Sequence, residues 1–95
     1  MASVRGRPTP ADHVFAILTD FAKLTDVPAQ LKLMMFAFLD EPSARFDDIA
    51  KLCASAAAAA PHDDPPEGYL LLGWPQTAYW KDRTTLLEHR YLATP

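Results

Sequence analysis

The hydrophobic residues of this chain recur with helical spacing in its first part. Thr9, Pro10 and Asp12 come just before this pattern and supply an N-cap, a proline at the first helical position and an acidic residue in the first turn. Apolar residues then follow every three or four positions, which predicts a helix that begins near Pro10 and packs by one face. The apolar positions are Val14, Ile17, Leu18, Phe21 and Leu24.

The segment 28–39 (PAQLKLMMFAFL) is apolar on almost every side of the helix that it would form. One stripe follows helical spacing and consists of Leu31, Met34, Met35, Phe38 and Leu39. Leu33 and Phe36 add apolar bulk outside this stripe, and Asp26 and Pro28 repeat the cap and proline signal. We therefore expect a second helix from Pro28 to Leu39 that forms the centre of the fold, in part as a contact surface for another chain.

A third helix is expected between Ser43, a potential N-cap, and Pro61, which would end it. Its end, from Ala56 to Ala60, has high helix propensity and small side chains that allow a neighbouring backbone to approach closely. The predicted buried stripe is Phe46, Ile49, Ala50, Cys53, Ala57 and Ala60.

The last third of the chain has a weaker pattern. An apolar run before Gly73 predicts a short extended segment near 69–74. Beyond it, Trp80, Leu87 and Tyr91 share one helical stripe and favour a fourth helix, whereas the β-branched Thr84 and Thr85 leave a hairpin open for 76–92.

These elements predict a mainly α protein, a compact bundle of three to four helices, with a winged-helix-like α+β fold as the alternative. We expect a flexible N-terminal arm over 1–9, one helical domain over 10–92 with an acidic, proline-rich loop at 61–68, and a tail over 93–95.

Charge and cysteine content restrict the function classes. The chain has 95 residues and a net charge of -3, with nine Lys and Arg scattered among twelve Asp and Glu, which argues against a general polyanion binder. The single cysteine, Cys53, fits a reducing compartment. No segment has the length of a signal peptide core or a membrane span, so we expect a cytoplasmic protein without a membrane partner.

Candidate chemistry is sparse. Cys53 is the best candidate nucleophile, but its place on an apolar stripe predicts a buried structural thiol. His62, Asp63 and Asp64 are adjacent potential ligands, yet a closed metal site needs about four that converge, and His13 and His89 are distant in sequence. We therefore expect no enzyme, no metal and no cofactor.

Two short patterns resemble DNA-binding proteins. Arg5, Gly6, Arg7 and Pro8 resemble the centre of an AT-hook, which implies that Arg5 and Arg7 enter a minor groove. Residues 31–55 look like the first two helices of a helix-turn-helix domain. The position of the recognition helix, however, is taken by Ala56 to Ala60, which cannot reach a base edge. A degenerate helix-turn-helix or winged-helix regulator is therefore the alternative function, and a nucleic-acid partner is not favoured.

The aromatic residues of the last third favour protein recognition, because Tyr and Trp are frequent interface anchors. Methionine adds an adaptable contact surface. We expect a small non-enzymatic interaction or regulatory protein of the adaptor or inhibitor type, which binds another protein or itself. The predicted contact residues are Tyr69, Trp74, Tyr79, Trp80, Tyr91, Met34 and Met35.

Overall fold

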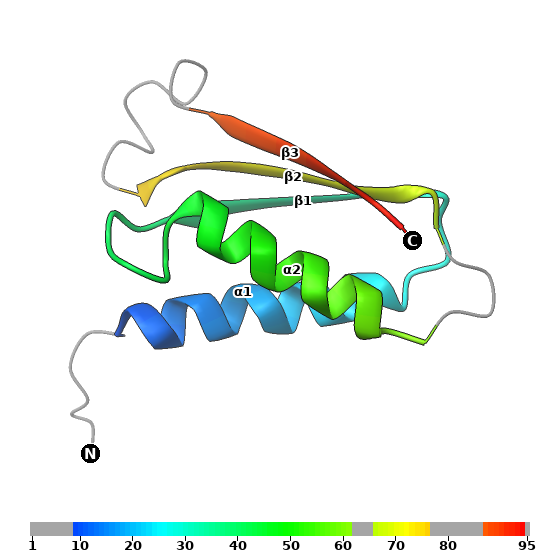
Figure 1. Ribbon diagram of the computed structural model, residues 1–95, viewed down its shortest axis with the longest axis horizontal. Helices are drawn as coiled ribbons and strands as arrows, with labels where there is room; N and C mark the ends of the chain where they lie inside the picture. Colours follow the sequence, from blue (N-terminus) through cyan, green and yellow to red (C-terminus); the bar gives the residue numbers. More distant parts are fainter. Residues whose placement is uncertain (1–8, 62–65, 77–86, 95) are drawn as a thin grey trace.

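The computed structural model describes residues 9–61, 66–76 and 87–94 of the chain. Along the chain lie α1 (Pro10–Thr25), β1 (Leu31–Phe38), α2 (Phe46–Ala59), β2 (Gly68–Pro75) and β3 (Glu88–Ala93). Both helices lie on one side of a sheet formed by the strands (Figure 1). The described part of the chain is therefore an α+β fold of two layers.

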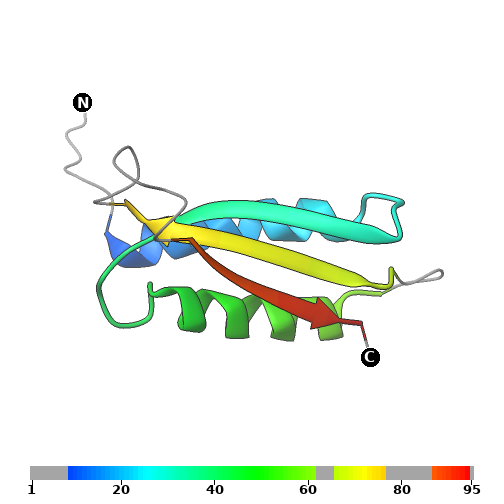
Figure 2. The ribbon, with the colours of Figure 1, turned by 90° about the horizontal axis from the view of Figure 1, so that it is seen from above.

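The strands lie in the order β1-β2-β3, with β2 in the centre. β1 and β2 are parallel and are connected through α2, whereas β2 and β3 are antiparallel. Leu33 is opposite Leu70, which in turn is opposite Tyr91. Viewed from above, α1 lies behind the β1 side of the sheet and α2 lies toward the β3 side (Figure 2). Among the described residues, no helix covers the other face of the sheet.

The predicted helical bundle is wrong, because the segment expected to form its central helix is the strand β1. In this strand Lys32, Phe36 and Phe38 are buried against the helices, while Leu33 and Met35 on the alternate positions are exposed. A short apolar run on both faces fits a strand and a buried helix equally well, so its periodicity alone did not decide between them.

The helix-turn-helix resemblance is also wrong, since it needs a helix where β1 lies. The alternative of a winged-helix-like α+β fold agrees with the structure only in its α+β class, because it includes the same helix. The extended segment predicted at 69–74 lies within β2. In the C-terminal region, β3 pairs with β2, so residues 88–93 are strand and not helix. The remaining part of the predicted fourth helix or hairpin, residues 77–86, lies outside the described residues.

The start of the first helix is confirmed. The Thr9 hydroxyl accepts a hydrogen bond from the Asp12 amide (3.1 Å), and the Asp12 carboxylate accepts one from the Thr9 amide (3.0 Å). The predicted cap of α2 is wrong, because the N-cap is Arg45. Ser43 instead has a positive φ of 71° in the loop before the helix, and its amide donates to the Asp48 carboxylate (3.1 Å).

The core lies between the helices and the covered face of the sheet. The Phe36 and Phe46 rings stack with centroids 5.5 Å apart, and Phe38 meets Phe46 edge-on at 5.9 Å. Phe46 lies this close because Gly73 has no side chain: a Cβ there would be 2.7 Å from the Phe46 ring. At the other end of the core, the Phe21 and Tyr69 rings are 4.9 Å apart.

Candidate functional site

The face of the sheet that points away from the helices is apolar. Strand alternation and the register place the same-side residues of β1, β2 and β3 next to one another there. We call this surface the open face. It consists of Leu31, Leu33, Met35, Ala37, Gly68, Leu70, Leu72, Trp74, His89, Tyr91 and Ala93.

The open face is accessible along its two outer strands. On β1, Leu31, Leu33 and Met35 are 55%, 52% and 57% exposed, and on β3 Tyr91 is 48% exposed. Among the described residues this face carries no Asp, Glu, Lys or Arg. Single exposed apolar residues are ordinary, but a contiguous apolar patch marks an interaction surface.

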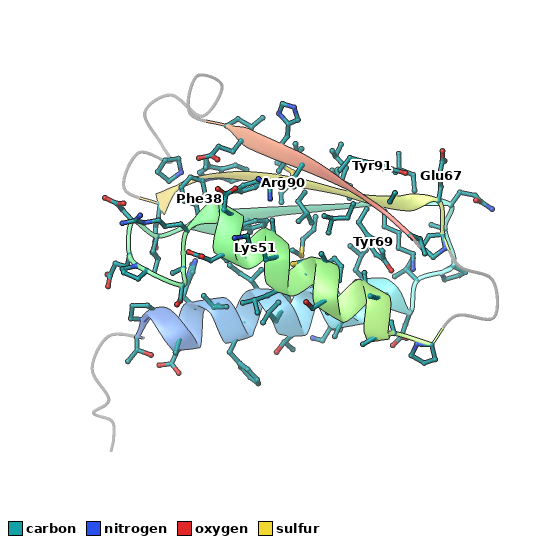
Figure 3. All side chains as sticks on the ribbon, in the orientation of Figure 1. Phe38, Lys51, Glu67, Tyr69, Arg90 and Tyr91 are labelled. Carbon is teal, nitrogen blue, oxygen red and sulfur yellow. The ribbon has the colours of Figure 1, made fainter. Side chains whose placement is uncertain are left out.

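Tyr91 has a defined position on the open face. Its ring lies over Gly68, where an added Cβ would be 2.3 Å from the Tyr91 hydroxyl oxygen. The hydroxyl donates a hydrogen bond to the Glu67 carbonyl oxygen (3.2 Å). Tyr91 and Tyr69 lie on opposite sides of the sheet, with Tyr69 toward the helices (Figure 3). A partner would therefore meet a Tyr91 side chain that is already ordered, which lowers the entropy cost of binding.

The outer edge of β1 is a second candidate for recognition, since an edge strand can pair with an added strand. The Gln30 carbonyl accepts from the Glu67 amide and thus points toward β2. Backbone groups alternate in direction along a strand, so those of Leu31, Leu33, Met35 and Ala37 point to the outer edge.

Two side chains limit the addition of a further strand at this edge. Near one end, His13 on α1 donates through Nε2 to the Ala37 carbonyl oxygen (2.7 Å). Near the other, Lys32 points inward and is only 4% exposed. Its Nζ donates to the Thr25 carbonyl oxygen (2.9 Å) and lies 5.6 Å from the centre of the Tyr69 ring. An inward-pointing charge on an edge strand is a common device against strand addition.

The predicted contact residues separate in the structure. Met35 and Tyr91 lie on the open face, whereas Tyr69 is fully buried among the helices and Met34 packs partly buried against the core. Trp74 lies on the same side as Leu70 and Leu72 but is only 7% exposed, so little of its ring is available to a partner.

Tyr79 and Trp80 lie outside the described residues, as do Arg5 and Arg7 of the alternative DNA-binding hypothesis. The sequence reasoning missed Leu31, Leu33, Leu70 and Leu72 as contact residues. A period-two reading of 31–38 would have separated Leu31, Leu33 and Met35 from the core positions.

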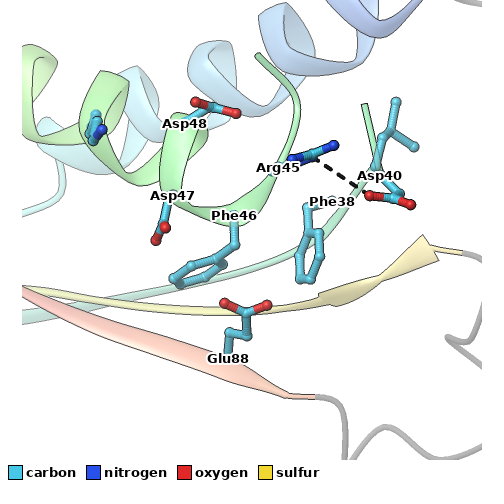
Figure 4. Close-up of a pocket in the computed structure, with 9 residues that line it drawn as sticks. Phe38, Asp40, Arg45, Phe46, Asp47, Asp48 and Glu88 are labelled. Carbon is cyan, nitrogen blue, oxygen red and sulfur yellow. Dashed lines mark ion pairs between the residues drawn. The ribbon is translucent and has the colours of Figure 1, made fainter. Parts of the chain in front are cut away.

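A polar cleft of about 510 Å³ lies at the end of β1 and the start of α2 (Figure 4). Three of its carboxylates have partners inside the protein: Asp40 pairs with Arg45 (3.6 Å), Asp47 pairs with Arg90, and Asp48 accepts from the Ser43 amide. Arg90 also lies over the Phe46 ring at 5.6 Å. These contacts connect the loop, α2 and β3, so the charged groups that form them have a structural role.

On the helix side, an apolar groove lies between α1, α2 and the loop after β1. Phe15, which is 72% exposed, and Leu52 both line it. This groove is a second apolar surface, on the opposite side of the molecule from the open face.

Cys53 is fully buried in α2, and burial raises the pKa of its thiol to about 12. The thiol is therefore protonated near neutral pH, which is the opposite of what a nucleophilic cysteine requires. Within residues 9–61, 66–76 and 87–94, no group of three or more His, Cys, Asp and Glu side chains could hold a metal ion. The potential ligands His62, Asp63 and Asp64 lie outside these ranges.

Neither helix of the described chain has the length and apolar character needed to cross a membrane. Comparison of the chain with protein-family models, with curated proteins and with solved structures finds no match.

Proposed function

We propose that this chain is a small non-enzymatic interaction protein that binds a protein partner through the open face of its sheet. The observation that carries the proposal is the row of side chains on Leu31, Leu33 and Met35, each of which is more than half exposed. Antiparallel and mixed sheets commonly expose one face, but that face is then normally polar. An apolar one is costly in water unless another surface covers it.

The composition of the face supports a protein partner over a nucleic acid. Binding to phosphate requires Lys or Arg on the contacting surface, and the described open face has neither. Exposed leucine, methionine and tyrosine are instead the kind of side chains that form the core of protein interfaces. We place the protein in the cytoplasm, in keeping with its single, buried and unpaired cysteine.

The test compares two matched substitutions, Leu33→Arg on the open face and Leu52→Arg on the helix side. Both replace a half-exposed leucine with the same charged residue, on opposite sides of the molecule. Each tagged variant and the wild-type chain are used to capture proteins from lysate of the source cells, with nuclease present, and the captured proteins are identified by mass spectrometry.

We expect Leu33→Arg to capture at least tenfold less of the partner than the wild-type chain does. Leu52→Arg should capture the same amount as the wild type. Circular dichroism checks that both variants are folded. Equal capture by Leu33→Arg and the wild type would contradict the proposal, and selective loss in Leu52→Arg would move the binding site to the helix-side groove.

A further inference from the structure

We infer that the open face is covered by a second copy of this chain, packed sheet against sheet with the helices of both copies outside. This inference rests on the proposed function, because it names the protein that the open face binds. Two packed sheets form an apolar layer about 10 Å thick, and such a layer would bury the exposed leucine and methionine side chains of both copies.

Charge permits a second copy as the occupant only where the two copies meet through the open face. Each chain has a net charge of -3, so two copies repel each other over most of their surfaces. The described open face has no Asp, Glu, Lys or Arg, so contact there brings no like charges together. The same face has no fixed charge with which to select an oppositely charged partner. An uncharged patch with the same residues on both sides meets the requirement of a two-fold interface.

The size of the face matches a weak dimer. Three strands about 4.8 Å apart and eight residues that each rise about 3.3 Å make a face of roughly 14 by 26 Å. Its flat footprint is on the order of 400 Å² on each copy, whereas stable interfaces bury about 1,200 Å² or more in total. We therefore expect a dimer that dissociates on dilution in the micromolar range.

Pairing of the two copies through the edges of β1 is less compatible with the structure. Lys32 points inward from this strand and its Nζ donates to the Thr25 carbonyl oxygen, and an inward-pointing charge of this kind opposes the addition of a strand at the edge. Edge pairing would also compete with the bond from His13 to the Ala37 carbonyl. Finally, it would join two open faces into one larger exposed surface and cover neither.

The first measurement is sedimentation equilibrium of the full chain over concentrations from about 1 μM to 1 mM. The expected mass rises from one chain of 10.5 kDa toward twice that value. Leu33→Arg should stay at the mass of one chain throughout, and Leu52→Arg should follow the wild type. Met35→Arg takes the place of Leu33→Arg if circular dichroism shows that the latter is unfolded.

The second measurement determines which surfaces meet. β2 is the central strand, so a two-fold axis through the centre of the open face brings β2 of one copy over β2 of the other. A short bismaleimide that spans about 10 Å, the separation of packed sheets, should therefore join Leu72→Cys of one copy to the same position of the other, while the native thiol of Cys53 is fully buried and does not compete. Leu52→Cys is the matched control and should not crosslink.

Several outcomes would overturn the inference. A wild-type chain that remains a monomer up to 1 mM, while Leu33→Arg still loses a partner from lysate, overturns the dimer but leaves the proposed function standing. If Leu33→Arg changes neither the mass nor the capture, both fail. A dimer that persists in Leu33→Arg, with slow amide exchange at Leu33 and Met35, would be edge-paired and would also overturn the inference.

Discussion

Gly73 determines how closely α2 approaches the sheet. Its backbone faces the Phe46 ring, and the Phe36 ring lies on the same side. An alanine Cβ at this position would be 2.7 Å from Phe46 and 3.3 Å from Phe36, so one of the rings or the strand itself must move. The close contact of a residue without a side chain and a large ring therefore joins the β2 strand to the first turn of α2.

We predict that Gly73→Ala lowers the free energy of unfolding by about 1 to 3 kcal/mol, because it overpacks a core contact. Urea denaturation followed by circular dichroism measures the change. In a Phe46→Leu background the smaller side chain leaves room for the Cβ, and the same substitution should then cost less. An equal cost in both backgrounds would show that the ring contact is not the reason.

Cys53 provides a prediction about pH. Burial raises the pKa of its thiol from 9.0 to about 12, so the unfolded chain loses this proton at a lower pH than the folded chain. Stability from this group is fully present below pH 9 and is lost as the pH rises from 9 toward 12. We expect a slope of up to about 1.4 kcal/mol per pH unit in that window.

The measurement compares the free energy of unfolding of the wild type and Cys53→Ala at several pH values from 8 to 11. Other groups titrate in both proteins, so the difference between the two free energies of unfolding reports on the thiol alone. This difference should be constant below about pH 9, and above that pH the wild type should lose stability relative to Cys53→Ala. A difference that stays constant throughout would contradict the raised pKa. Slow alkylation of the folded wild type is expected from the same burial.

At the level of elements, both helices and an extended segment within β2 could be predicted from the sequence, whereas β1 and the pairing of the strands could not. The buried residues of α1 and α2, among them Val14, Phe21 and Cys53, belong to the predicted stripes. The sequence of β1 predicts a helix as readily as a strand, because helical spacing and strict alternation both match an eight-residue apolar run. Its pairing with β2 involves residues far away in sequence, which no local pattern reports.

Lys32 affects whether the edge of β1 can pair with a strand of another chain. We predict that Lys32→Met leaves the fold intact, since replacing a buried charge with an apolar side chain of similar volume is often neutral or stabilising. Without the inward charge, however, the β1 edge becomes free to pair with another strand. Light scattering should therefore detect species larger than those of the wild type at the same concentration.

Lys51→Met is the matched control for this experiment, because Lys51 is exposed on α2 and its replacement makes the same change in net charge. In the larger species of Lys32→Met, the amides of Leu33 and Met35 should exchange more slowly than in the wild type. An unchanged mass distribution for Lys32→Met would show that Lys32 does not protect the edge.

At the level of the whole molecule, the two-layer arrangement of the described residues leaves much of the open face exposed, including Leu31, Leu33 and Met35. If a second copy covers it, dimerisation stabilises the folded state by mass action. We predict that the melting temperature of the wild type rises by a few degrees between about 5 μM and 500 μM protein, whereas that of Leu33→Arg does not change with concentration. Calorimetry or circular dichroism at matched heating rates measures both.

By itself, the sequence determined the two helices, the cap of α1, the buried position of Cys53 and the apolar character of residues 31–39. These properties depend on residues close together along the chain, where periodicity and capping chemistry act directly. Only the tertiary structure decided that residues 31–38 are a strand. The same pairing assigned Leu33, Met35 and Tyr91 to one open face and directed Lys32 and Tyr69 into the core. The physical reason is that a strand acquires its two faces from its neighbours in the sheet, and those neighbours are distant in sequence.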